Sequence, residues 1–327
     1  MLSHDVGALT SRLGARVEID ACTVSDRSAF MPLRPPGIYS ANGAAKLVRT
    51  GDGWVAVNLA RPEDLDLLPA WLGVEAGEAP WDAIDAACAG RSSRAVAGRA
   101  RLLGLPVARP GETRARRLHP RVIRMPPAGA KRPISARLRV IDLSSLWAGP
   151  LCGAVFADAG AEVIKVESRA RPDGGHALGA AFFAHFNRNK GPLTLDFADA
   201  DDLFRLREMI FGANVLITSA RARAFAGLGL TPAEVFSRNP SLTWVAITGH
   251  GFCGARADRV AFGDDAAVAG GLVVRDAEGK PRFFGDAAAD PVTGLAAAVG
   301  GLKAVLAGGG ALVDAAMARA SAGALHA

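Results

Sequence analysis

The fold is decided between Leu138-Arg-Val-Ile-Asp-Leu143 and Glu162-Val-Ile-Lys-Val-Glu167. Both segments are short apolar runs rich in β-branched residues, which are typical of buried strands. The segment from Ala148 to Ala159 has helical length and is followed by Gly160, a residue type that commonly ends helices. A strand, a helix and a second strand in this order predict two parallel strands joined by a right-handed crossover.

The same alternation continues along the second half of the chain. We predict further strands at 193–196, 214–217 and 242–247, and helices from Asp199 to Phe211 and from Thr231. Strands separated by helices are typical of a parallel sheet, whose ligands bind beyond the carboxyl ends of the strands. This half therefore predicts a Rossmann-like domain with its site in the loops that follow the strands.

The first half of the chain has a different pattern. Two runs at 45–49 and 54–59 flank Thr50-Gly-Asp-Gly53, which predicts a β-hairpin. This mixture indicates a small α+β domain. Its remaining predicted elements are helices at 61–71, 80–89 and 91–103, and an extended segment at 105–108.

A proline-rich segment separates the two halves. Pro126-Pro-Ala-Gly-Ala-Lys-Arg-Pro-Ile-Ser-Ala136 has the composition of a linker. We therefore expect an α/β protein in which a small α+β domain at 1–125 precedes the linker at 126–136. The Rossmann-like parallel-sheet domain is expected at 137–327.

The overall composition excludes several classes of protein. With 327 residues, 50% of them hydrophobic and 21% charged, the chain is too apolar for disorder and long enough for one large or two domains. It has no apolar run of ~18 residues, and its first residues lack the pattern of a signal peptide. Its four cysteines are widely spaced, which argues against a disulfide framework and a structural metal site. We expect a cytoplasmic protein with neither a metal nor a membrane partner.

The net charge of +6 is concentrated in one stretch. Residues 91–139 contain 14 basic residues and a single acid, Glu112. Such a stretch can bind nucleic acid, bind a phosphorylated or acidic partner, or form a solvated face. Because it contains no aromatic residue and no nucleic-acid recognition motif, we expect no nucleic-acid partner and leave the other two interpretations open.

The turn after the first predicted strand tests a dinucleotide-binding hypothesis. A dinucleotide site needs GxGxxG, so that the backbone can approach the pyrophosphate. The turn here, Ser144-Ser-Leu-Trp-Ala-Gly-Pro150, has one glycine and two bulky residues, and GxxxxGK[ST] is absent from the chain. Both kinds of nucleotide loop are therefore excluded.

Two motifs carry a family resemblance. Val140-Ile-Asp-Leu-Ser-Ser-Leu-Trp-Ala-Gly-Pro150 and Ala157-Asp-Ala-Gly-Ala-Glu-Val-Ile-Lys-Val-Glu167 resemble the start of the family III CoA-transferases. This family includes formyl-CoA transferase, the carnitine-CoA transferases and α-methylacyl-CoA racemase. Other landmarks follow in the family's order over about 138–320: 186–190 with 193–196, 214–217 with 227–231, 239–242 with 247–251, 290–294 and 313–317.

The order of the two halves differs from that of the family. Thr50-Gly-Asp-Gly-Trp-Val-Ala-Val57 and Leu103-Gly-Leu-Pro-Val-Ala108 resemble parts of the family's small domain, which follows the nucleotide-fold domain in those proteins. The chain thus resembles a permuted and shortened family member.

The resemblance assigns a catalytic role to Asp290. The family's nucleophile is an aspartate followed, after three residues, by glycine, and Asp290-Pro-Val-Thr-Gly294 matches this pattern. A carboxylate can hold an acyl group as an anhydride, which remains as reactive as the thioester. The long apolar segment that follows places Asp290 at a helix N-terminus, where the dipole favours an anion. Competing carboxylates are Asp286, Asp264 and Asp265.

The resemblance also implies a CoA-binding site, with acyl-CoA as substrate. After the fourth predicted strand, Thr218-Ser-Ala-Arg221 replaces the Asn-Phe of the family, and Arg223 adds charge. An arginine after the second strand can pair with a phosphate. The expected CoA-binding residues are Ser145, Leu146, Trp147, Ala148, Arg169, Leu195, Ser219 and Arg221.

Three functional hypotheses remain open. The first is a CoA-transferase that moves CoA between a thioester and a small carboxylic acid through an aspartyl intermediate. The second is a CoA-ester racemase or isomerase, although the racemase histidine position aligns with Phe262 and the nearest histidine is His250. The third is a non-catalytic CoA-binding or scaffold subunit. The resemblance further implies a homodimer, interlocked as in the family, or a heteromer with a related transferase.

Overall fold

The computed structural model describes residues 1–75, 77–125 and 137–327, and the predicted linker at 126–136 lies outside these residues. The chain divides into two compact units. Unit 1 contains Met1–Met31, His119–Ala257 and Pro291–Ala316. Unit 2 contains Pro32–Leu118, Asp258–Asp290 and Met317–Ala327.

Unit 1 is built on a seven-stranded sheet with the strand order β4-β12-β9-β8-β5-β6-β7. All neighbouring strands are parallel except β4, which pairs antiparallel with β12 at one edge. The predicted α/β class with a large parallel sheet is therefore confirmed. The strands are β4 (Arg121–Arg124), β5 (Arg139–Leu143), β6 (Glu162–Ser168), β7 (Gly191–Leu195), β8 (Val215–Thr218), β9 (Thr243–Thr248) and β12 (Ala311–Ala316).

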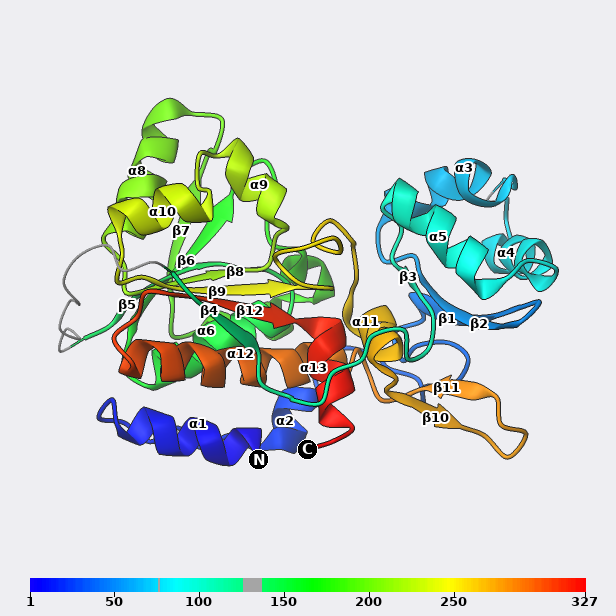
Figure 1. The fold of residues 1–327 in the computed structure, drawn as a ribbon, viewed down its shortest axis with the longest axis horizontal. Coiled ribbons are helices and arrows are strands. Elements are labelled where there is room, and N and C mark those ends of the chain that lie inside the picture. Colours follow the sequence, from blue (N-terminus) through cyan, green and yellow to red (C-terminus); the bar gives the residue numbers. More distant parts are fainter. Residues whose placement is uncertain (76, 126–136) are drawn as a thin grey trace. The chain divides into compact units, whose positions relative to one another are not determined.

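Helices cover both faces of this sheet (Figure 1). One face packs against α8 (Ala200–Phe211), α9 (Ala222–Gly227) and α10 (Pro232–Arg238). The other face packs against α6 (Ala148–Asp158) and α12 (Ala289–Leu306), and α1 (Leu2–Ser11) runs along α12. The remaining helical elements of this unit are α2 (Ala21–Ser25), the 3-10 helix Gly174–Leu178 and α7 (Ala180–Asn187).

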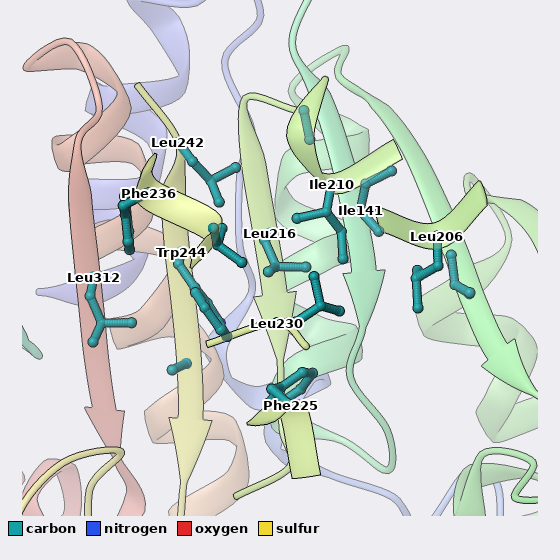
Figure 2. Close-up of a cluster of buried hydrophobic side chains, with 14 of the residues drawn as sticks. Ile141, Leu206, Ile210, Leu216, Phe225, Leu230, Phe236, Leu242, Trp244 and Leu312 are labelled. Carbon is teal, nitrogen blue, oxygen red and sulfur yellow. The ribbon is translucent and has the colours of Figure 1, made fainter. Parts of the chain in front are cut away.

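An apolar cluster of unit 1 lies between the sheet and helices α8 to α10 (Figure 2). Trp244 on β9 is fully buried there, and its Nε1 donates a 2.9 Å hydrogen bond to Oγ1 of Thr218 on β8. A tryptophan can be buried completely when its single donor finds a partner. This bond also ties β8 and β9 together, and its acceptor Thr218 lies at the carboxyl end of β8, where the candidate site begins.

Unit 2 is built on a three-stranded antiparallel sheet of β1 (Ala45–Thr50), β2 (Gly53–Asn58) and β3 (Val107–Ala108). Successive side chains of a strand face opposite sides, so Val55 and Val57 pack against helices while Ala56 packs on the other face. The predicted hairpin and short extended segment are confirmed. The helices against the first face are the 3-10 helix Pro62–Leu67, α3 (Leu68–Leu72), α4 (Pro80–Ala89) and α5 (Ser93–Leu103).

The second face of this small sheet packs against α11 (Gly263–Gly270) and a hairpin of β10 (Val273–Arg275) and β11 (Pro281–Phe283). Helix α13 (Met317–Ala324) packs closely on α11, because Gly270 has room only for a hydrogen where it meets Ser321 and Ala322. These elements complete the core of unit 2.

The two units differ from the predicted division at 125 and 137. Residues 1–31 and strand β4 belong to unit 1, because β4 hydrogen-bonds to β12. Residues 258–290 and 317–327 belong to unit 2, because α11 and α13 pack together there. A division read along the sequence misses such returns of the chain, since they depend on pairing between distant segments.

Among the described residues, α12 is long and apolar enough to cross a bilayer by length and composition alone. Of that segment, 78% is buried inside the protein. Burial of this extent is what a core helix shows.

Candidate active site

The turn between β5 and α6 is held by three side chains, one on β5 itself and two in the segments that follow β6 and β8. The Ser144 amide donates to Oδ1 of Asp142 at 3.0 Å and the Ser145 amide to Oγ of Ser219 at 2.8 Å. The Leu146 amide donates to Oδ1 of Asp173 at 2.8 Å. Because these three consecutive amides are already bonded within unit 1, none of them is free to donate to a phosphate.

Asp173 lies at the centre of a buried polar group. Its Oδ2 is 2.7 Å from Nζ of Lys165, and both side chains are almost completely buried. Lys165 Nζ also donates to the carbonyl oxygen of Ser144. The carboxylate of Asp173 additionally accepts the amide of Gly175 at 2.8 Å. This ion pair therefore fixes a carbonyl and an amide of the same β5–α6 turn.

A second buried ion pair lies beneath the turn. Nζ of Lys190 is 2.8 Å from Oδ2 of Asp142, and neither side chain is exposed. Burial acts to raise the pKa of Asp142, but the ammonium groups of Lys190 and Lys165 outweigh it and lower that pKa. A Cβ at Gly153 would lie 2.4 Å from Oδ2 of Asp142, so helix α6 can approach this pair only with glycine there.

The predicted CoA-binding residues lie in unit 1 at the carboxyl ends of β5, β6, β7 and β8. Ser145 and Ser219 are brought together by their hydrogen bond. Leu195 is buried and its carbonyl accepts the amide of Arg169, whose side chain is exposed. Arg221 is half-buried at the start of α9.

Trp147 and Ala148, which begin α6, are both buried. The guanidinium carbon of Arg27 lies 4.7 Å from the centre of the Trp147 ring, and the Phe182 ring packs edge-on at 5.8 Å. Among the described residues, Nε1 of Trp147 has no hydrogen-bond partner. The Trp147 ring is thus enclosed by other side chains rather than presented toward a ligand.

Asp290 lies in the first turn of α12, which begins at Ala289, and it belongs to unit 2. It is half-buried, and its amide donates to the carbonyl of Ala287 at 2.8 Å. Gly263, the first residue of α11, packs directly against it, since a Cβ at position 263 would lie 2.1 Å from Oδ2 of Asp290. The start of the long helix supplies a dipole that favours the carboxylate.

The competing carboxylates have different surroundings. Asp264 is buried and accepts the amide of Ala287 at 3.0 Å, while Asp286 is half-buried. Asp265 is fully buried and accepts the amide of Phe262 at 2.8 Å and Nδ2 of Asn58 at 3.1 Å. Burial raises the pKa of Asp265 to about 7, an effect that these hydrogen bonds only partly offset.

Gly294, the glycine of the Asp-x-x-x-Gly pattern, packs against the start of α6 in unit 1. A Cβ at this position would lie 2.7 Å from the carbonyl oxygen of Ala148 and 2.9 Å from Cδ2 of Leu151. The glycine therefore has a packing reason, because it lets α12 cross the first turn of α6 at close range.

His250 follows β9 and is buried in unit 1. Phe262, the position aligned with the racemase histidine, is the N-terminal neighbour of α11 in unit 2. No group of three or more His, Cys, Asp or Glu side chains that could hold a metal occurs in the part of the chain that the structure describes.

Three polar residues that hold or underlie the β5–α6 turn, Asp173, Lys165 and Lys190, were not predicted from the sequence. Asp173 precedes Gly174-Gly175, and an aspartate before glycines is a common turn signal. No comparable signal marks Lys165 or Lys190, because each stands within or beside an otherwise ordinary strand.

Residues 136–326 match the family described as CoA-transferase family III. This is more than half of the chain, and the chain belongs to that family.

Individual relatives agree with this assignment. A succinate–glutarate CoA-transferase of Agrobacterium fabrum is 30% identical over 183 residues, which are 50% of this chain and 45% of that protein. The α-methylacyl-CoA racemase of Mus musculus is 33% identical over 117 residues, 36% of this chain and 28% of that protein. A crystal structure of a CaiB/BaiF family protein from Brucella suis matches with a TM-score of 0.54 and 29% identity, over 57% of this chain and 54% of that one. The chain spans about half the length, or less, of the curated relatives it matches.

Proposed function

We propose that this chain carries out CoA transfer between an acyl-CoA thioester and a small carboxylic acid, with Asp290 as the nucleophile. The observation that supports this most is the Asp290-Pro-Val-Thr-Gly294 pattern at the start of α12, in a chain of this family. Gly294 packs on Ala148 at the start of α6, next to the turn that carries four of the predicted CoA contacts.

The proposed reaction proceeds through covalent intermediates on the Asp290 carboxylate. An oxygen of Asp290 attacks the thioester carbonyl, and the C–S bond breaks to give a mixed anhydride and CoA thiolate. The thiolate attacks the aspartyl carbonyl, which releases the first acid and leaves an aspartyl-CoA thioester. The second acid attacks this thioester, again releasing CoA thiolate. Attack of the thiolate on the new acyl carbonyl then yields the product thioester and regenerates Asp290.

The surroundings of Asp290 suit this role. The resting carboxylate lies at the positive end of a helix of 18 residues, which stabilises its charge. Gly263 leaves space for the carboxylate where any larger residue would displace it. The nucleophile is thus held in one place by packing.

The CoA portion would lie on the β5–α6 turn and the neighbouring strand ends. Since the amides of 144–146 are bonded internally, the turn offers apolar surface and carbonyl oxygens rather than a phosphate cradle. The phosphate groups of CoA would pair instead with the guanidinium groups of Arg169 and Arg221, which follow β6 and β8.

A racemase or isomerase is the second candidate, and the similarity to α-methylacyl-CoA racemase favours it. Phe262 at the aligned histidine position opposes it, because a phenyl ring cannot move a proton. A non-catalytic CoA-binding or scaffold subunit is the third candidate, which the replacement of the family's Asn-Phe by Thr218-Ser-Ala-Arg221 favours. We further propose a cytoplasmic homodimer, or a heteromer with a related transferase.

Trapping tests the proposal directly. The protein is incubated with a panel of acyl-CoAs, hydroxylamine is added, and peptides are mapped by mass spectrometry. Hydroxylamine cleaves aspartyl anhydrides and thioesters and leaves a hydroxamate, so modification at Asp290 is the expected result. Modification at Asp286 or Asp264 instead would reject the assignment. If calorimetry detects no binding of CoA to the protein, the result would favour a scaffold subunit that does not bind CoA.

A further inference from the structure

Only two residues other than glycine have a left-handed backbone among residues 1–75, 77–125 and 137–327. They are Leu146, with φ 70°, and Ala287, with φ 43°. This conformation is disfavoured for residues with a Cβ, and it persists where the surroundings enforce it. Leu146 lies in the predicted CoA-binding turn, and Ala287 lies three residues before Asp290.

Each of these residues gives its amide hydrogen to a buried aspartate. The Leu146 amide is 2.8 Å from Oδ1 of Asp173 in unit 1. The Ala287 amide is 3.0 Å from Oδ1 of Asp264 in unit 2. Both carboxyl groups belong to residues that are at least 95% buried, so the hydrogen bonds form away from water, where they are strongest.

The surroundings of Leu146 strengthen the first of these contacts. Asp173 is held by its ion pair with Lys165, and Lys165 also bonds the carbonyl of Ser144 in the same turn. The Leu146 side chain lies against Gly174, where a Cβ would come within 2.9 Å of its Cδ2. The turn is therefore fixed from both its backbone and its side chain.

The surroundings of Ala287 connect the second contact to the nucleophile. The carbonyl of Ala287 accepts the amide of Asp290 at 2.8 Å. Gly263 packs on Ala287 as well as on Asp290, because its Cβ would lie 2.6 Å from the Cβ of Ala287. A change in the backbone conformation of Ala287 would therefore shift the start of helix α12 and, with it, the position of the Asp290 carboxylate.

We propose that Asp173 and Asp264 are positioning residues, each enforcing the left-handed residue of one loop. The proposal rests on the proposed function, since it assigns the Leu146 loop to CoA binding and the Ala287 loop to the nucleophile. Asp173 then controls CoA affinity, and Asp264 controls the rate of the chemical step. Neither residue touches the reacting atoms.

Glycine supplies the test, because it adopts the left-handed conformation without a supporting hydrogen bond. The full chain is prepared with Asp173→Ala, Asp264→Ala, Leu146→Gly and Ala287→Gly, and with the double variants Asp173→Ala/Leu146→Gly and Asp264→Ala/Ala287→Gly. Asp264→Asn serves as the conservative variant, since its amide oxygen accepts the same bond. The dissociation constant for CoA, kcat and the melting temperature are measured for each.

The matched control is Asp276→Asn. Asp276 also pairs with an arginine, Arg282, and accepts the backbone amides of Glu278 and Lys280. It lies in the β10–β11 hairpin turn, which carries no predicted site residue. Both constants should stay at the wild-type value in this variant.

We expect Asp173→Ala to weaken CoA binding about tenfold. We expect Asp264→Ala to lower kcat about tenfold and to leave KM unchanged. Both factors correspond to the free energy by which the left-handed conformation is disfavoured for a non-glycine residue. Each double variant should differ little from the single variant that carries only its glycine substitution, because glycine needs no supporting hydrogen bond. Asp264→Asn should retain the wild-type kcat. Equal losses with and without the glycine, or losses confined to the melting temperature, would overturn the proposal.

Two further measurements keep the result interpretable. If Asp173→Ala does not fold because Lys165 is left without its counter-ion, the double variant Lys165→Met/Asp173→Ala replaces it in the same cycle. If the wild type neither binds CoA nor transfers it, the proposed function fails. Amide hydrogen exchange at Leu146 and Ala287 then decides the positioning role, which loss of protection in the alanine variants supports and unchanged protection overturns.

Discussion

Gly263 is in direct contact with Asp290: a Cβ at position 263 would lie 2.1 Å from Oδ2 of the carboxylate. The same Cβ would lie 2.6 Å from the carbonyl oxygen of Ala287. Both distances are far below van der Waals contact, so the first residue of α11 has to be glycine if Asp290 is to keep its place.

We expect Gly263→Ala to reduce CoA transfer at least tenfold, because it displaces the carboxylate or the backbone that carries it. The control is Gly98→Ala in the middle of α5, where a Cβ meets nothing within 4 Å. Alanine is the better helix former, so Gly98→Ala should raise the free energy of unfolding by about 0.5–1 kcal/mol and leave turnover unchanged. Wild-type turnover in Gly263→Ala would contradict the close packing.

A second prediction concerns the fully buried Asp265. Burial raises its pKa from the ordinary 3.8 to about 7, so the folded state holds this proton more tightly than the unfolded chain. The free energy of unfolding should therefore fall as the pH rises from about 4 to about 7, and the shift corresponds to about 4 kcal/mol. Above pH 7 the full cost of the buried charge is present.

Asp265→Asn should remove this dependence. The asparagine amide can also donate to Oδ1 of Asn58, an atom that has no hydrogen-bond partner among the described residues. In urea denaturation, the variant should be more stable than the wild type at pH 8, and the difference should disappear near pH 4. A difference that is constant with pH would show that Asp265 titrates normally.

How far the sequence predicts this structure differs from element to element. The strands that begin near Leu138, Glu162 and Thr243 have local apolar patterns strong enough to be recognised, and all three occur in the sheet. Strand β4 was missed, since Arg121-Val-Ile-Arg124 is short and half charged and becomes a strand only through pairing with β12. Local pattern carries no information about such pairing.

The candidate site shows the same limit. Asp290 and the serines of the β5–α6 turn could be selected from their motifs. The positioning roles proposed for Asp173 and Asp264 could not be predicted, because they rest on bonds to the amides of Leu146 and Ala287, which depend on backbone conformations that no local pattern reveals. Left-handed non-glycine residues are enforced by tertiary contacts.

A third prediction concerns the buried pair of Lys190 and Asp142. Lys190→Met leaves the carboxylate buried without its main counter-charge, and it should lower the free energy of unfolding at pH 7 by about 3–5 kcal/mol. The pKa of Asp142 is lowered in the folded protein, so the difference from the wild type should shrink as the pH falls below 3.8. The control is Lys280→Met at an exposed position, where no measurable change is expected. A loss below about 1 kcal/mol at pH 7 would mean that Asp142 is not charged.

The last prediction tests the nucleophile itself. Asp290→Asn keeps the size and polarity of the side chain in the first turn of α12, but a carboxamide cannot form the anhydride with an acyl group. Its loss of a favourable charge at the helix start should cost about 0.3–1 kcal/mol, so the variant should fold. Transfer between an established acyl-CoA and acid pair should fall to the uncatalysed level, and hydroxylamine should give no modified peptide. The control is Asp286→Asn, a half-buried carboxylate four residues earlier, which should retain turnover. If Asp290→Asn turned over like the wild type while Asp286→Asn did not, Asp286 would replace Asp290 as the nucleophile. The glycine of the Asp-x-x-x-Gly pattern would then be explained only by the packing of Gly294 against Ala148.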